Sequence, residues 1–272
     1  MTDLLTQDHV ARFRRDGWCL VSPFFDAREV RALAAEVARF RRQGLLRNVR
    51  TDGDGQTHSE SRANLQLIPL HDKSNLIRAL PFSPKVSGAV SCLIGDPFLL
   101  HLDQLFLKPG RTGTGTHWHQ DNAYFKIDDP LKGTAMWVAV HDATLANGTL
   151  RLIPGSHRHS YAHERDPYSD HHIHCSPPEA EAVAVEVPAG GVVFFCYGVA
   201  HSTGDNATDE ERAGMAFHFL HGDHASADLV EAGRRHRPWI TGPEATGGLR
   251  EYGVDLGIRA FEDEVGQLET AA

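Results

Sequence analysis

Cysteine is scarce in this chain of 272 residues: Cys19, Cys92, Cys175 and Cys196 lie far apart, and no two of them form a C-x-x-C pair. A chain of this length can bury a sizeable core without a disulfide framework, so we expect reduced thiols and a cytoplasmic location. No apolar run approaches the roughly 18–20 residues needed to span a bilayer, so no membrane partner is expected. Residues 1–5 show neither the basic nor the apolar region of a signal peptide.

Positive charge is in deficit, since 27 Lys and Arg face 36 Asp and Glu, which gives a formal net charge of −9. A nucleic-acid partner is therefore not expected, because phosphates require a basic surface. Three common enzyme signatures are missing too: the G-x-S-x-G nucleophile turn, the G-x-x-x-x-G-K-[ST] phosphate loop and a strand-initiated G-x-G-x-x-G. The remaining composition, 41 % apolar and 23 % charged, is typical of a soluble globular enzyme.

Helical patterns occupy the first third of the chain. A short helix is expected over residues 6–15, and Asp26 with Glu29 forms a capping box for a longer one that Gly44 closes. Ser83 and Pro84 begin a further helix, which ends at Gly95. Short β-rich runs separated by turns predict strands at 18–21, 98–108, 134–141, 149–153, 182–187, 192–196 and 214–221.

This order of elements predicts a mainly β fold with flanking helices, in which the core is a double-stranded β-helix, the jelly roll of the cupin type. We expect a single domain over residues 1–272. Its core would span about 98–221, with a helical N-terminal flank at 1–97 and a C-terminal extension at 222–272.

Two long connections interrupt the pattern. Residues 47–72 are polar and weakly patterned, which indicates a mobile loop or, alternatively, a segment that closes over a site. Residues 156–181 carry six histidines and are interpreted as a variable loop near a substrate entrance. A zinc site within residues 171–175 is the alternative, although the run lacks a second pair of ligands.

His119 and Asp121 follow a glycine-rich turn at residues 110–115 and form an H-x-D motif. On an extended strand their side chains would point to the same face and could bind one metal ion. One further histidine would complete the two-His, one-carboxylate set of non-haem Fe(II) oxygenases, which leaves three coordination positions open. Two other H-x-D motifs begin at His101 and His221, but the first lacks the flanking turn and the second lies too near the C-terminus.

Two downstream residues are candidates for the same site. His201 ends an apolar strand at the mouth of the predicted barrel, where it could reach a metal held by a neighbouring strand or could simply lie in a turn. Arg212 could bind a carboxylate in a bidentate fork, or could be an ordinary surface arginine.

The chain resembles the phytanoyl-CoA dioxygenase family of Fe(II)/2-oxoglutarate oxygenases from about residue 18 to 220. The matching segments, in family order, are WHQD at 118–121, AMWVAV at 135–140, NGTLRLIPGSH at 147–157, GGVVFF at 190–195, HSTGDN at 201–206 and Arg212. The resemblance implies His119, Asp121 and His201 as iron ligands and Arg212 as the partner of the distal carboxylate of 2-oxoglutarate. It also places Trp137 and Thr203 in the co-substrate pocket, and Gln104 there through a looser match of the upstream strand.

The resemblance implies Fe(II), 2-oxoglutarate and O₂ as the reacting set, with succinate and CO₂ released and a small-molecule substrate hydroxylated. Related halogenases carry a small residue where this chain has Asp121, so the carboxylate favours hydroxylation or another oxidative step. Epimerisation, desaturation or ring formation would use the same ligands. A metal-binding cupin without activity is the non-enzyme alternative, and it would not need Arg212.

Overall fold

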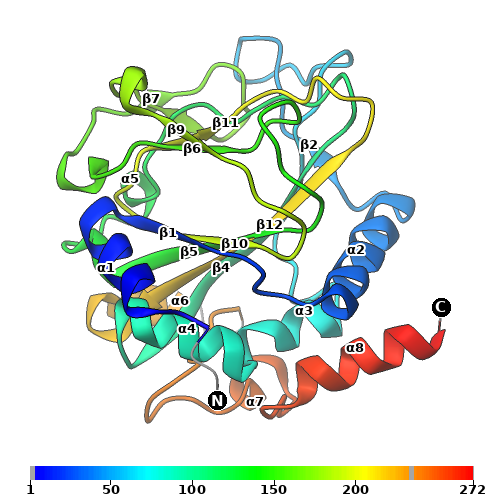
Figure 1. Cartoon of the computed structure of the whole chain (residues 1–272), viewed down its shortest axis with the longest axis vertical. Helices are drawn as coiled ribbons and strands as arrows, with labels where there is room; N and C mark the ends of the chain where they lie inside the picture. The colour runs from blue at the N-terminus through cyan, green and yellow to red at the C-terminus, as the bar shows by residue number, and fades with distance from the viewer. Residues whose placement is uncertain (1–3, 233–235, 272) are drawn as a thin grey trace.

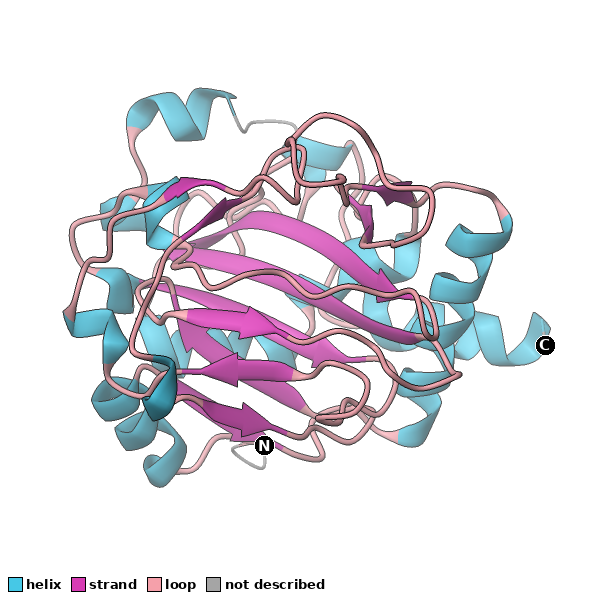
Figure 2. Ribbon diagram, turned by 90° about the horizontal axis from the view of Figure 1, so that it is seen from above, coloured by secondary structure: helices cyan, strands magenta, loops and turns pink. Residues whose placement is uncertain are grey.

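The strands form two sheets that lie one above the other, with most of the helices against the outer face of the larger sheet (Figure 1). The computed structural model describes residues 4–232 and 236–271, so residues 1–3 of the N-terminal stretch considered above lie outside it. Seen from above, the strands run side by side across the molecule (Figure 2). The predicted jelly-roll architecture, mainly β with flanking helices, is confirmed, although the two sheets do not close into a barrel.

The larger sheet has the order β1-β10-β5-β12-β4-β3-β2, the smaller has the order β11-β6-β9, and β7 and β8 form a separate hairpin. The strands are β1 (Trp18–Val21), β2 (Arg47–Asn48), β3 (Leu65–Leu67), β4 (Phe98–Lys108), β5 (Gly133–Ala139), β6 (Leu150–Leu152), β7 (Glu164–Arg165), β8 (Ile173–His174), β9 (Val183–Val185), β10 (Val192–Cys196), β11 (His201–Thr203) and β12 (Arg212–His221). All pairs of strands are antiparallel.

Most of the helices lie in the N-terminal and C-terminal parts of the sequence. They are α1 (Gln7–Asp16), α2 (Ala27–Arg42), α3 (Asn75–Ala79), α4 (Pro84–Ile94), α5 (Asn122–Phe125), α6 (Ala227–Ala232), α7 (Leu249–Tyr252) and α8 (Ala260–Ala271). One apolar core cluster joins the larger sheet to α2, α3 and α4, and Phe261 and Val265 of α8 belong to it. None of the helices that the structure describes has the length and apolar character needed to cross a bilayer.

The starts of α2 and α4 can be compared with the predicted capping signals. Asp26 caps α2 by accepting from the backbone N–H of Arg28 and Glu29, and the Glu29 carboxylate accepts from the Asp26 N–H, so the predicted capping box is confirmed. Ser83 precedes α4 as predicted, but its hydroxyl donates to the Leu80 carbonyl (2.8 Å) and does not cap the helix. Proline at the first helical position, with its fixed φ, is compatible with this start.

Residues 47–72, predicted as a loop that is mobile or closes over a site, contain two short strands, and Asn64 and Ile68 line the cavity described below. Strands β2 and β3 lie there and extend the larger sheet beyond β4. The turn between them is held by side chains, since Asn48 donates to the carbonyls of Ser59 and Arg62 (3.0 Å each). The N-terminal flank therefore supplies strands to both edges of the larger sheet, β1 at one and β2–β3 at the other.

Candidate active site

A cavity of about 220 Å³ lies between the two sheets. All seven residues singled out from the sequence line it: Gln104, His119, Asp121, Trp137, His201, Thr203 and Arg212. The larger sheet contributes side chains from β4, β5, β10 and β12, and the smaller sheet contributes from β6 and β11. Residues 64–68 and the histidine-rich connection complete the wall with Asn64, Ile68, His171 and His172.

One group of side chains that could hold a metal ion lies in this cavity. Within residues 4–232 and 236–271, His119, Asp121 and His201 are the one set of three or more His, Cys, Asp or Glu residues whose donor atoms all lie within 4.8 Å of one another. Asp121 Oδ1 lies 3.7 Å from His119 Nε2 and 3.8 Å from His201 Nε2. Two imidazoles and one carboxylate with these atoms converging fit a ferrous ion that retains open coordination positions.

The local structure around these ligands differs from the predicted strand. His119 forms an isolated bridge with His201, in which each backbone N–H donates to the other's carbonyl (3.0 and 2.9 Å). Asp121 has helical dihedrals and immediately precedes α5 as its N-cap residue. The two side chains therefore converge because a bridge is followed by a helical turn, and not because of the alternation of a continuous strand.

Hydrogen bonds fix which nitrogen of each imidazole is free. His119 Nδ1 donates to the His117 carbonyl (2.8 Å) and His201 Nδ1 donates to the Val199 carbonyl (3.0 Å), so both Nε2 atoms keep their lone pairs toward Asp121. Burial, and next the neighbouring His201, lower the pKa of His119 to about 3, and burial also lowers the pKa of His201. Both imidazoles are therefore neutral near pH 7, as metal ligation requires.

The Asp121 carboxylate is oriented by a residue that sequence reasoning missed. His218 Nε2, on β12, lies 3.2 Å from Asp121 Oδ2 and donates to it, which leaves Oδ1 facing the two imidazoles. Burial raises the pKa of the Asp121 carboxyl, but His201 and His218 outweigh this effect and hold the pKa well below its usual range. The carboxylate is thus ionised and aimed before any metal binds.

Two buried basic side chains also line the cavity. Arg212 begins β12 and Lys108 ends β4, and the two are direct partners in the antiparallel register. Arg212 Nη2 donates to the Gly148 carbonyl (2.6 Å), and its Nε is buried without a hydrogen-bond partner. Burial lowers the pKa of the Arg212 guanidinium to about 10, so the side chain stays charged at neutral pH. A buried, partly unsatisfied guanidinium in a cavity is suited to an anionic ligand.

Three other predicted residues line the same cavity as Arg212, and Trp137 lies beside it. Its guanidinium carbon lies 5.5 Å from the centroid of the Trp137 ring. A Cβ at position 214 would lie 2.5 Å from Trp137, so Gly214 leaves the space that this indole occupies. Thr203 Oγ1 accepts from the Thr116 N–H (2.9 Å), and Gln104 faces the cavity from β4.

The pleat of β4 separates cavity residues from packing residues. Leu102, Gln104, Phe106 and Lys108 line the cavity, whereas Asp103 lies on the other face and accepts from the backbone of Leu70 and His71. A lysine four residues after Gln104 shares its strand face, and this spacing was the sequence signal for Lys108. The signal for His218 was the same, because it shares a face of β12 with Arg212.

The other two H-x-D motifs do not reach the metal-binding group. His101 Nδ1 lies 3.2 Å from the Tyr197 hydroxyl, and Asp103 is held by His71. His221 Nε2 donates to the Asp96 carbonyl (3.0 Å), and Asp223 is exposed. The choice of His119 over these motifs agrees with the geometry.

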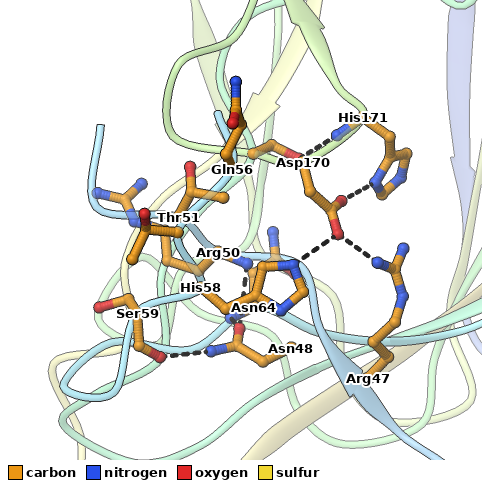
Figure 3. A network of polar contacts seen from close by, with 12 residues as sticks. Arg47, Asn48, Arg50, Thr51, Gln56, His58, Ser59, Asn64, Asp170 and His171 are labelled. Carbon is orange, nitrogen blue, oxygen red and sulfur yellow. Dashed lines mark hydrogen bonds and ion pairs between the residues drawn. The ribbon is translucent and has the colours of Figure 1, made fainter. Parts of the chain in front are cut away.

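The histidine-rich connection, residues 156–181, reaches the cavity through two of its histidines. His172 is buried and accepts from Gln66 Nε2 (3.2 Å), and burial lowers its pKa to about 3. Next to it, the Asp170 carboxylate accepts from Arg47, from His58 Nε2 (3.1 Å) and from His171 Nδ1 (2.5 Å), and Figure 3 shows this network joining the connection to residues 47–64. The alternative of a zinc site at residues 171–175 finds no set of close donors among the described residues.

The phytanoyl-CoA dioxygenase family model matches residues 13–214, about three quarters of the chain. The chain belongs to the phytanoyl-CoA dioxygenase family. Ectoine dioxygenase of Bordetella parapertussis is 28 % identical to it over 232 residues, which cover 78 % of this chain and 74 % of that relative. Membership of this family of Fe(II)- and 2-oxoglutarate-dependent oxygenases makes the chain an enzyme of that class, as the sequence predicted.

Solved structures of this enzyme class share the fold. EctD from S. alaskensis with 2-oxoglutarate and 5-hydroxyectoine has a TM-score of 0.66 at 22 % identity, covering 82 % of this chain and 79 % of that one. The non-heme alpha ketoglutarate dependent carbocyclase SnoK from nogalamycin biosynthesis has a TM-score of 0.67 at 20 % identity, covering 80 % and 84 %.

Proposed function

We propose that this member of the phytanoyl-CoA dioxygenase family hydroxylates a small molecule at an Fe(II) ion held by His119, Asp121 and His201. One observation carries the proposal: three side chains that could hold a metal ion line the same cavity as a buried guanidinium whose Nε has no hydrogen-bond partner. A metal-binding cupin without activity would have no use for Arg212 at that position. Bound iron and 2-oxoglutarate would supply the oxidising power, with succinate and CO₂ as the co-products.

The residues of the chain contribute position and charge. His119 and His201 present neutral Nε2 atoms, and Asp121 presents one carboxylate oxygen while His218 holds the other. Arg212, with Trp137 beside it, would bind the distal carboxylate of 2-oxoglutarate, and Thr203 and Gln104 would line that co-substrate. This division assigns Asp121 to iron and Arg212 to the co-substrate.

The remaining cavity wall describes the substrate. Ile68, Leu102, Phe125 and Phe195 are apolar, and the buried His172 is neutral. Among the described lining residues, the charged side chains other than histidine are Lys108, Asp121 and Arg212. The part of the substrate that approaches the metal is therefore uncharged and largely apolar, because an ion there would be buried without a partner.

Product analysis tests the reaction. Purified enzyme with Fe(II), 2-oxoglutarate and O₂ should form succinate, faster when an apolar substrate from a metabolite panel is accepted, and a chelator should abolish the reaction. His119→Ala, Asp121→Ala and His201→Ala should each lose nearly all turnover, while His221→Ala should keep it. Near-normal turnover by His201→Ala at saturating iron would show that the ligand assignment is wrong.

Ring formation is a second candidate outcome, supported by the fold shared with the carbocyclase SnoK. The same assay distinguishes it, because hydroxylation adds one oxygen atom to the substrate whereas ring closure removes two hydrogens. We also propose a cytoplasmic location, which the four free cysteines support.

A further inference from the structure

We infer that His172 is a substrate-binding residue, and that its Nδ1–H donates a hydrogen bond to an uncharged carbonyl oxygen of the substrate. The inference rests on the proposed function and deepens it, because it adds one polar group to a substrate that is otherwise largely apolar where it approaches the metal. His172 lies in the histidine-rich connection, outside every motif by which the chain resembles its family.

Backbone hydrogen bonds hold His172 at the cavity wall. Ser169 Oγ accepts from the backbone N–H of His172 (3.2 Å), and the His172 carbonyl accepts from the Asp166 N–H (3.0 Å). The residue is 8 % exposed and lines the cavity. The imidazole is therefore part of the cavity wall and is carried by a fixed backbone, although it comes from a long connection.

Gln66 fixes which ring nitrogen of His172 carries the proton. It lies on β3 between the lining residues Asn64 and Ile68, and its Nε2 is 3.2 Å from His172 Nε2. An amide nitrogen can only donate, so His172 Nε2 accepts this hydrogen bond. Burial is the main cause that lowers the pKa of His172 to about 3, so the ring is neutral near pH 7. A neutral imidazole that accepts at Nε2 carries its proton on Nδ1.

The Nδ1–H of His172 is left without an acceptor. Within residues 4–232 and 236–271, the contact with Gln66 is the only hydrogen bond of the His172 side chain. A buried donor is unfavourable when a ligand covers it without accepting, so we expect the substrate to bring the acceptor. An uncharged oxygen fits better than a carboxylate, because the neutral ring offers no counter-charge. His119 also contributes to the lowered pKa of His172, so this donor lies near a proposed metal ligand.

Nitrogen NMR tests the tautomer without any substrate. Enzyme containing isotope-labelled histidine would be loaded with Zn(II), which is diamagnetic, in place of iron. The spectrum of His172→Asn identifies the His172 signals by their loss. We expect a neutral ring protonated at Nδ1 in wild type and a mixture of both tautomers in Gln66→Leu, because the donor to Nε2 is then gone. A proton on Nε2 in wild type would overturn the inference.

Two ligands of similar shape test the hydrogen bond itself. Acetophenone carries a carbonyl oxygen where α-methylstyrene carries a methylene group, and both are uncharged. The Kd of each would be measured by calorimetry for enzyme with Fe(II) and 2-oxoglutarate, kept free of O₂. Wild type should bind the ketone about two- to tenfold more tightly, the range that one neutral hydrogen bond contributes. His172→Leu should lose this preference, whereas His172→Asn should keep part of it, because its amide can donate from the position of Nδ1.

A second histidine of the same connection provides the matched control. His174 Nε2 lies 3.4 Å from Glu164 Oε1, outside the set of residues that line the cavity, so His174→Leu should keep the preference of wild type for the ketone. If wild type binds both ligands equally, or binds neither up to its solubility limit, the inference is overturned while the proposed function stands. If Fe(II), 2-oxoglutarate and O₂ yield no succinate with any member of the metabolite panel, the proposed function itself fails.

Discussion

His218 offers the sharpest test of how the metal site is held, because its single hydrogen bond sets the orientation of Asp121. Replacing it with leucine removes the 3.2 Å contact to Asp121 Oδ2 and leaves that buried oxygen without this donor. A hydrogen bond to a buried charged group contributes about 1.5–3 kcal/mol. The Kd for Fe(II) should therefore rise about ten- to hundredfold, the range typical of residues that support metal ligands.

The pH dependence should move as well. The pKa of Asp121 lies below its usual range, and His218 is one of the groups that lower it. Iron binding needs both the ionised carboxylate and neutral imidazoles, so in wild type it is lost as the pH falls through the range in which His119, His201 or Asp121 takes up a proton. Without His218 the pKa of Asp121 rises toward its usual range, so protonation of Asp121 should become limiting and His218→Leu should lose iron at a higher pH than wild type does.

The assay is titration of metal-free enzyme with Fe(II) under argon, at several pH values, with Tm recorded in parallel. His218→Gln should recover much of the affinity, because its side-chain nitrogen can replace Nε2 as the donor. His221→Leu, on the same strand but bonded to the Asp96 carbonyl, should alter Tm without altering iron affinity. Equal iron affinity in His218→Leu and wild type would refute the reasoning.

Three further predictions concern the co-substrate pocket and its entrance. Arg212→Ala should raise the KM for 2-oxoglutarate about ten- to hundredfold, and Arg212→Lys should recover part of the loss. Steady-state succinate assays measure this KM, and an unchanged value in Arg212→Ala would contradict the role of the guanidinium. Gly214→Ala should lower both the Tm and the affinity for 2-oxoglutarate, because the added Cβ would lie 2.5 Å from Trp137. Calorimetry measures both quantities, and normal values would mean that the indole has room to move. Asp170→Asn should raise the KM for substrate but leave substrate-free succinate formation intact, because it loosens the network with Arg47 beside the lining residues His171 and His172 and leaves the proposed metal ligands in place. Equal loss of both rates would argue against a role in substrate binding.

Much of the framework was accessible from sequence because local patterns encode it. Strands β1, β4 and β10 begin and end where predicted, since each is a run of β-forming residues bounded by turn residues. The capping box at Asp26 is equally local, requiring only a partner three residues away. The resemblance to the family identified seven residues, and all seven line one cavity.

Segments held by distant contacts were not accessible in this way. Strands β2 and β3 contain two and three residues, too few to show a period, and they exist because β3 pairs with β4 and Asn48 bonds across the turn. The role of His218 depends on Asp121 lying opposite β12, which only the assembled sheets bring about. Sequence reasoning therefore missed the residue that holds Asp121 in place, although it predicted Asp121 as a metal ligand.

The three H-x-D motifs show why spacing alone could not select the metal site. His101 and Asp103 do share one face of β4, as a period of two requires, but the pairing of β4 with β3 and β12 turns the other face, with Leu102 and Gln104, into the cavity. His119 and Asp121 are not on a strand, and their common direction comes from the backbone bridge to His201. The ligand set therefore depends on a contact between residues far apart in the chain, and the same bridge that aims His119 also delivers the third ligand.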